Sequence, residues 1–438
     1  MKHNSPQKIV IATMVGTAIE YFDNYIYAMA AVLVFNHQFF SSADPLSNQL
    51  ASLSTLALAF LARPIGSILF GHIGDKFGRK KSLVFSLIMM GISTVVIGFL
   101  PTYQSIGIGA TILLCLCRVG QGIGIGGEWG GAALVAIENA PKNRRAWFGI
   151  FPQLGAPIGL LLANAVFFIV SMIVGEKAFV EWGWRIPFIS SVVLVVIGLY
   201  VRMTLWESEV FEKTKQSGKL VKLPVANLLK KYYRVFLAGI FLATAGYVLF
   251  YILAAFAQIY AKSPTTLSPA GYAQGLGFSS QVFTKYLLIS SVVFAIAIAL
   301  SGILSDKWGR KPFLIGTTIL IILFGFAIPL FLENGTETSL FMFLMVGMIL
   351  MGATFGPMSV ILPELFPTEI RYTGSSLSYN VAGILGASVA TIITLQINAN
   401  FGLMGVGIYL ALNGVLSLVA LLRVPETGNS DKVNITDL

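Results

Sequence analysis

The sequence predicts an all-α membrane protein with twelve transmembrane helices in two related six-helix bundles. Three observations lead to this fold class. Only 11% of the 438 residues are charged and 56% are hydrophobic, whereas soluble domains carry about 25% charged residues. The hydrophobic residues lie in long runs, and the two halves of the chain share short motifs. This composition excludes a soluble enzyme, a disulfide-rich secreted protein and a disordered chain.

A helix needs about 20 mostly apolar residues to cross the hydrocarbon core of a bilayer. The runs that meet this criterion lie at residues 10–35, 49–70, 82–100, 108–136, 146–173, 185–203, 234–260, 281–304, 313–332, 339–361, 373–397 and 400–423. These runs are continuous and lack the polar alternation of barrel strands. We therefore expect helices, six in each half of the chain.

The basic residues lie mainly on one side of the expected membrane. If the N-terminus is cytoplasmic, 23 of the 29 lysines and arginines fall in cytoplasmic segments, Arg202 among them, and four fall outside. Cytoplasmic loops of membrane proteins carry this excess of positive charge. We expect an inner-membrane protein with both termini in the cytoplasm. Topology then explains the net charge of +10, and no nucleic acid partner is needed.

A long polar stretch divides the spans into two groups of six. We expect an N-terminal bundle over residues 1–203, a cytoplasmic linker over 204–233, a C-terminal bundle over 234–424 and a cytoplasmic tail over 425–438. Within the linker we expect a short surface helix at 224–231.

Two motifs recur in register in the two halves. GHIGDKFGRK at 71–80 returns as GILSDKWGRK at 302–311, with six of ten positions identical. The pattern Glu-x2-Pro-x3-Arg at 138–145 returns at 364–371. Two independent repeats indicate a duplicated six-helix unit. Transporters are commonly built from such units, with the substrate site where the repeats meet.

The repeated loops supply residues for a polar latch at the cytoplasmic surface. Their glycines allow close approach of helices, and their aspartates lie at helix ends, where they can accept backbone N–H groups or pair with arginines. Such a latch would break when the two halves move apart. The alternative is a basic loop that only anchors the topology. The candidate gating residues are Gly71, Asp75, Arg79, Asp306, Arg310, Glu138, Arg145, Glu364 and Arg371.

These loops resemble the signature loop of the major facilitator superfamily. Further segments resemble its metabolite:proton symporter family, nearly end to end: GTAIEYFDNYIYA (16–28), FLARPIGSILFGHIGD (60–75), GGEWGGAAL (126–134), PQLGAPIG (152–159), WGWRIPF (182–188) and PELFPTEIRYTG (363–374). The resemblance implies the major facilitator fold and proton-coupled uptake. That family includes systems for α-ketoglutarate, citrate, shikimate, dicarboxylates, and proline or betaine, so the substrate stays open.

Charged residues inside the spans are functional candidates, because each costs about 2.5–3.5 kcal/mol at the bilayer centre. Glu20, Asp23 and Tyr27 share one stripe of the first span. Two carboxylates one turn apart in a low dielectric cannot both ionise easily, so we expect one of them to carry a proton. The alternative is a structural pair held ionised by neighbouring arginines.

Arg118 in the fourth span lies at a depth comparable with that of Asp23, so we expect the two to pair. The resemblance implies the same pair, since similar proton-coupled porters of the superfamily place an aspartate in the first span against an arginine in the fourth. Protonation of Asp23 would then release Arg118 as a two-state switch. The candidate proton-coupling residues are Glu20, Asp23 and Arg118.

Arg63 lies near the middle of the second span, where its planar guanidinium suits a substrate carboxylate. The alternative is a structural partner of Glu128 or Glu20. Aromatic and amide side chains expected to face the interior complete the candidate set, and interior packing is the alternative for them. The candidate substrate-binding residues are Arg63, Tyr27, Glu128, Trp129, Gln153, Tyr247, Tyr251, Tyr379 and Asn380.

The sequence therefore predicts a secondary active transporter that takes up a small organic acid or zwitterion with protons by alternating access. We assign proton coupling to the first half, where the charges concentrate, and substrate shape to the second. A proton-driven exporter of drugs or metabolites is the alternative. The sequence contains no catalytic motif or metal-ligand spacing, so we expect neither an enzyme nor a cofactor. The expected partners are the substrate, protons and the lipid bilayer, and we expect a monomer.

Overall fold

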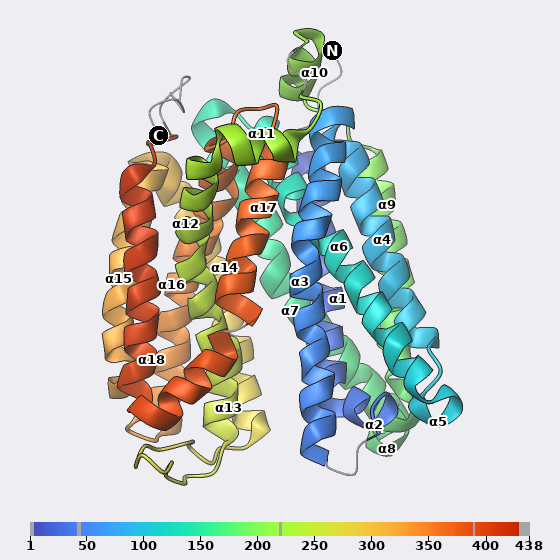
Figure 1. Ribbon diagram of the computed structural model, residues 1–438, viewed down its shortest axis with the longest axis vertical. Coiled ribbons are helices and arrows are strands. Elements are labelled where there is room, and N and C mark those ends of the chain that lie inside the picture. Colours follow the sequence, from blue (N-terminus) through green and yellow to red (C-terminus); the bar gives the residue numbers. More distant parts are fainter. Residues whose placement is uncertain (1–3, 42–44, 219–220, 389, 429–438) are drawn as a thin grey trace. The chain divides into compact units, whose positions relative to one another are not determined.

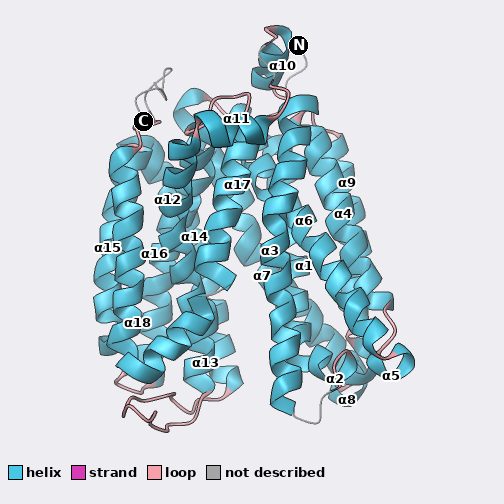
Figure 2. Cartoon of the chain, viewed as in Figure 1, coloured by secondary structure: helices cyan, strands magenta, loops and turns pink. Residues whose placement is uncertain are grey.

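The computed structural model describes residues 4–41, 45–218, 221–388 and 390–428. These residues form helices joined by loops, as Figure 2 shows. Their one β-type pairing within the described ranges is an isolated bridge between Leu267 and Ala273. The described residues divide into two compact units, each of which draws segments from both halves of the sequence.

The first unit contains the described residues up to Ala140, together with Phe151–Leu228 and Thr368–Asn380. Its long helices pack side by side (Figure 1). Its elements are α1 (Pro6–Ala30), a π-turn (Ala31–Phe35), α2 (Asn36–Gln38), α3 (Pro45–Phe77), α4 (Arg79–Phe99), α5 (Tyr103–Ile106), α6 (Ile108–Glu138), most of α7 (Arg145–Val174), α8 (Glu176–Ala178), a π-turn (Phe179–Gly183), α9 (Arg185–Met203), α10 (Glu209–Gln216), part of α11 (Pro224–Lys231) and most of α17 (Arg371–Gly383).

The second unit contains Pro141–Ile150, Leu229–Pro367 and the described residues from Val381 onward. Its own elements are a 3-10 turn (Lys142–Arg144), α12 (Tyr233–Tyr251), a π-turn (Ile252–Phe256), α13 (Ala257–Lys262), α14 (Ser280–Trp308), α15 (Arg310–Leu332), α16 (Glu337–Glu364), a π-turn (Ile384–Ser388) and α18 (Ala390–Arg423). The long helix α18 is broken at Gly402, whose φ of 69° lies outside the helical region.

Close helix packing positions the charged residues of the first unit. A side chain at Gly122 would overlap the carbonyl of Ala59, and one at Gly126 would overlap the carbonyl of Arg63. Small residues of this kind allow two membrane helices to touch through their backbones. The backbone of α3 that carries Arg63 is therefore held directly against α6.

The helices follow the predicted spans, and the predicted all-α fold is confirmed. Ten helices of the described part are long and apolar enough to cross a membrane. The last of them, Arg371–Arg423, contains two predicted spans separated by the break at Gly402. The first predicted span coincides with α1 and its π-turn, which are not among the ten. Counting the last helix as two spans and adding α1 gives the twelve predicted spans.

The predicted linker helix at 224–231 is confirmed as α11, whereas α10 was not predicted. The predicted division into two symmetric bundles on either side of 204–233 stays a prediction, because the compact units follow a different grouping of segments.

Candidate functional site

Asp23 on α1 is fully buried and belongs to a chain of hydrogen bonds that crosses three helices. Its Oδ2 accepts a bond from Thr94 Oγ1 on α4 at 2.7 Å. Thr94 Oγ1 accepts a bond from Gln121 Nε2 at 2.7 Å, and Gln121 Oε1 accepts one from Arg118 Nη1 at 2.9 Å. The structure therefore links Asp23 to Arg118 through two neutral side chains. Direct pairing of the two charges stays a prediction.

The guanidinium of Arg118 also contacts α1. Its Nη2 donates to Asn24 Oδ1 at 3.0 Å, and its central carbon lies 4.0 Å from the centre of the Tyr27 ring. The hydroxyl of Tyr27 donates to Thr55 Oγ1 at 2.6 Å. Tyr27, predicted as a substrate ligand, thus serves as a cation–π support for Arg118 in this structure.

Arg202 is a buried partner that the sequence interpretation missed. The sequence places Arg202 among the basic residues of the cytoplasmic segments. In the structure this residue is 1% exposed, because α9 continues through it and directs its guanidinium inward. Its Nη1 donates to Glu128 Oε2 at 2.9 Å and to the carbonyl of Leu83 at 2.7 Å, and its Nη2 pairs with Glu128 Oε1. Ser86 Oγ donates to Glu128 Oε2 at 3.1 Å. One signal could have indicated this pair: a glutamate inside a span, such as Glu128, requires a cation nearby.

Glu20 lies close to this pair. Arg202 packs against Gly16, one turn before Glu20 on α1, where any side chain would overlap the guanidinium. The positive charges of Arg63 and Arg202 both lie near enough to act on the carboxyl group of Glu20, which is 5% exposed. Arg63 is 8% exposed, and its guanidinium lies 4.0 Å from the centre of the Phe60 ring. Glu20, Glu128, Arg63 and Arg202 thus form a second buried charge centre in the first unit.

Trp129 contacts two other predicted substrate residues, and a fourth lies one turn away. The rings of Trp129 and Tyr379 stack with their centres 3.7 Å apart and their planes 5° from parallel. Trp129 Nε1 donates to Gln153 Oε1 at 3.0 Å. One turn along α6 from Trp129, Gly126 offers its carbonyl to the amide of Asn380 at 3.1 Å. The structure brings these four predicted residues together on α6, α7 and α17.

Tyr247 and Tyr251 lie on α12 of the second unit. The ring of Tyr247 lies against Gly383 and Gly386, where a side chain would crowd it. The ring of Tyr251 packs edge-on against Phe250, with the centres 5.5 Å apart.

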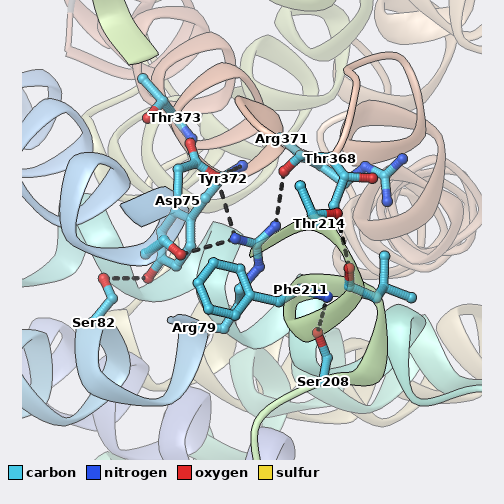
Figure 3. Close-up of polar contacts among 12 residues, drawn as sticks. Asp75, Arg79, Ser82, Ser208, Phe211, Thr214, Thr368, Arg371, Tyr372 and Thr373 are labelled. Carbon is cyan, nitrogen blue, oxygen red and sulfur yellow. Dashed lines mark hydrogen bonds and ion pairs between the residues drawn. The ribbon is translucent and has the colours of Figure 1, made fainter. Parts of the chain in front are cut away.

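Three predicted gating residues of the first unit, Asp75, Arg79 and Arg371, lie together in Figure 3. Asp75 at the end of α3 accepts the backbone N–H groups of Tyr372 and Thr373 at 3.1 and 2.9 Å. Arg79 pairs with Asp75 at 3.5 Å and with Glu138 at 3.2 Å, and it donates to the carbonyl of Thr368 at 3.0 Å. The cluster therefore binds the end of α3 to the first turn of α17.

Arg371 and Gly71 complete this cluster. Arg371 Nη1 lies 4.0 Å from Glu138 Oε1. A side chain at Gly71 would crowd Thr373, so this glycine permits the close approach of α3 and α17.

The second unit repeats this arrangement. Asp306 at the end of α14 accepts the N–H groups of Ala146 and Trp147 at 2.9 and 2.8 Å, in the first turn of α7. Glu364 pairs with Arg310 at 3.3 Å and with Arg145 at 3.2 Å, and Arg310 lies 3.7 Å from Asp306. The two sequence repeats thus fold into two equivalent polar clusters.

A third correspondence was not predicted from the sequence. Glu207 accepts the N–H groups of Arg79 and Lys80 at the start of α4, at 3.0 and 3.2 Å. Glu426 does the same for Arg310 and Lys311 at the start of α15, at 3.1 and 2.8 Å. Burial raises the pKa of Glu207 above its ordinary value, and the bonds from the two backbone N–H groups oppose this effect. Glu207 and Glu426 lie outside the repeated motifs, so comparison of the motifs could not predict their role.

Tyr372 joins the gating cluster to the buried charges of the same unit. Its backbone N–H bonds to Asp75, while its hydroxyl donates to the carbonyl of Gly127 at 2.6 Å and accepts from Ser82 Oγ at 3.0 Å. Gly127 precedes Glu128 on α6. Tyr372 therefore connects α17 directly to the backbone beside Glu128.

Comparisons with known proteins agree with these features. The family model described as Major Facilitator Superfamily matches residues 13–391, with a second match at 289–436. The inner membrane metabolite transport protein YhjE of Escherichia coli is 52% identical over 425 residues, covering 97% of this chain and 95% of that one.

Two relatives have named substrates. The proline/betaine transporter of Salmonella typhimurium is 32% identical over 434 residues, covering 97% of this chain and 84% of that one. The shikimate transporter of Escherichia coli is 32% identical over 428 residues, covering 96% and 95%.

A solved structure has the same fold. The proton:xylose symporter XylE bound to 6-bromo-6-deoxy-D-glucose is similar with a TM-score of 0.77 and 19% identity, covering 97% of each chain. This chain is thus a transporter and not an enzyme. It belongs to the Major Facilitator Superfamily, within its metabolite:proton symporter family, and is a multi-pass metabolite transporter of the inner membrane.

Proposed function

We propose that this transporter takes up a small organic acid or zwitterion together with protons, by alternating access. Relatives more than 30% identical include transporters named for proline and betaine, which are zwitterions, and for shikimate, which is a carboxylate. The observation that carries the proposal is the buried Asp23 and its connection through Thr94 and Gln121 to Arg118.

In this proposal Asp23 carries the proton. Its Oδ1 has no hydrogen-bond partner among the described residues, and a buried charge without full compensation is costly. Thr94 Oγ1 can donate to Asp23 or to the carbonyl of Met90, which lies 3.1 Å away. Protonation of Asp23 favours the second partner, because a neutral carboxyl is a weaker acceptor. The change then reaches Arg118 through Gln121.

Arg63 is the proposed ligand for a substrate carboxylate. The charge of Arg202 is already balanced by Glu128, whereas Arg63 makes no ion pair within the described residues. Tyr27, Glu128, Trp129, Gln153, Tyr379 and Asn380 already contact neighbouring groups. We therefore assign them to the wall and support of the site. Tyr247 and Tyr251 of the second unit stay proposed substrate residues that contribute shape.

The two polar clusters are the proposed gates. Each binds the end of a helix from one half of the sequence to the start of a helix from the other half: α3 to α17, and α14 to α7. Cytoplasmic opening requires these N-terminal turns to leave their aspartates. The gates are held by many bonds of about 1 kcal/mol each and are therefore reversible.

The test requires a substrate first. A thermal-shift screen of the purified protein against organic acids and osmolytes, including proline, betaine and shikimate, should identify one, since a ligand that binds the folded state raises the melting temperature. In proteoliposomes with an acidic exterior, the wild type should accumulate that substrate. Asp23→Asn should abolish accumulation driven by the pH gradient while substrate exchange continues.

Glu333→Gln is the matched control, because it removes one carboxylate at an exposed position. This variant should accumulate substrate as the wild type does. Accumulation against a gradient by Asp23→Asn would contradict the assignment of Asp23. Proton-driven expulsion of the substrate by the wild type would support the exporter.

A further inference from the structure

A groove of ≈620 Å³ lies where α3 and α9 end and α4 begins, at one side of the first unit. It is lined by Ile73, Phe77, Lys80, Lys81, Val84, Phe85 and Met203. Phe77, Phe85 and Met203 are 53%, 54% and 65% exposed. Large apolar side chains at the end of membrane helices face lipid chains or the interface with the headgroups. The groove therefore presents apolar side chains of the kind that face lipid.

Ammonium groups border this apolar surface. Lys81 is exposed and makes no hydrogen bond or ion pair within the described residues. Lys80 Nζ donates one bond to the carbonyl of Met203 at 2.6 Å, which leaves two of its three N–H groups available. Lys76 lies over the ring of Phe77, 5.3 Å from its centre. The neighbouring carboxylate, Glu207, is occupied by the two backbone N–H groups that begin α4.

The second repeat shows which of these features the fold requires. Lys311, the counterpart of Lys80, bonds to the carbonyl of Leu422 at 3.1 Å, so this lysine-to-carbonyl bond is common to both units. At the positions of Lys81 and Phe85, however, the second repeat has Pro312 and Gly316. The additional cation and the aromatic wall are thus not needed to form the loop or the helix start.

We propose that this groove binds a phospholipid with an anionic headgroup. The acyl chains lie against Phe77, Val84, Phe85 and Met203, and the phosphate lies between Lys80 and Lys81. Basic pockets between membrane helices recognise anionic headgroups in this way. The lipid would thereby hold α9 to the start of α4, next to the gating residue Arg79.

The experiment follows thermal unfolding of the full-length protein in dodecylmaltoside with added dioleoylphosphatidylglycerol. The lipid should raise the melting temperature, whereas dioleoylphosphatidylcholine and inorganic phosphate should not. Lys81→Ala should weaken the response to phosphatidylglycerol about fivefold, the effect of one basic residue near an anionic surface. Phe85→Ala should weaken it as well, without altering charge.

Lys307→Ala is the control, because this exposed lysine occupies the position of Lys76 in the second repeat. It should leave the response unchanged. Equal stabilisation by phosphatidylcholine would overturn the proposal, as would an unaltered response of Lys81→Ala. A response to inorganic phosphate equal to that of the lipid would show a simple anion site and would also overturn it.

Discussion

Arg202 and Glu128 show how a charge is kept inside the first unit. Their side chains are 2% and 1% exposed, and both carboxylate oxygens of the glutamate have a donor from Arg202 or Ser86. Two buried ions stabilise the fold only while each compensates the other, because the cost of removing an ion from water is several kcal/mol. The pair thus links α9 to α6, two helices that both pack against α1 and α4.

Arg202→Met should lower the free energy of unfolding by about 3–5 kcal/mol, because Glu128 is left buried and unpaired. The double variant Arg202→Met with Glu128→Gln should recover part of this loss. Chemical unfolding in detergent measures both. Lys213→Ala is the control, since its pair with Glu209 is exposed and contributes about 0.5 kcal/mol or less. A double variant no more stable than the single one would show that the unpaired charge is not the cause.

Glu207 should make stability depend on pH. Its raised pKa means that the folded state binds the proton more tightly than the unfolded state. The stability linked to this proton is fully present below the ordinary carboxyl pKa and is lost as the pH rises through the raised value. Glu207→Gln should flatten the melting temperature over this interval. Glu333→Gln should retain the wild-type profile, and an unchanged profile of Glu207→Gln would assign the dependence to another group.

At the scale of elements, two helix starts are held by distant aspartates. Asp75 accepts the first N–H groups of α17, and Asp306 accepts those of α7. The first turn of any helix has N–H groups without helical partners and attracts negative charge. The repeated motif therefore works as a cap supplied by another helix, which explains why an aspartate occurs at this position in both repeats.

Asp75→Asn should weaken the cap of α17 by about 1–2 kcal/mol, because a charged acceptor becomes neutral. Hydrogen exchange of the purified protein should rise at Tyr372 and Thr373 and stay unchanged at Ala146 and Trp147. Asp306→Asn should give the reverse pattern, so each variant serves as the control for the other. Equal increases at both helix starts would contradict independent caps.

At the scale of the whole molecule, the distribution of basic residues predicts the orientation of the chain. Segment 204–233 should be cytoplasmic, and the loop between α13 and α14 should face the other side. The cysteines Cys115 and Cys117 are first replaced by alanine. Lys213→Cys, 70% exposed in the wild type, should then react with an impermeant maleimide only from the cytoplasmic side. Thr265→Cys should react only from the opposite side, and labelling of both from one side would refute the topology.

The spans and the repeated motifs could be read from the sequence because their signals are local. Hydrophobic length marks a span, and Glu138 with Arg145 recurs as Glu364 with Arg371 at matching positions. The partners of these residues could not be read in the same way. The sequence does not show that Arg202 pairs with Glu128. That contact depends on how α9 is rotated and how deep it lies relative to α6.

The amino-acid sequence by itself determined the solvent in which the protein folds, its twelve spans, its duplicated motifs and its family. The tertiary structure alone decided that Arg202 neutralises Glu128, that Thr94 and Gln121 join Asp23 to Arg118, and that Glu207 caps α4. The physical reason is that burial and periodicity act along a single helix. The pairing of charges depends on which side chains from separate helices meet in a low-dielectric interior.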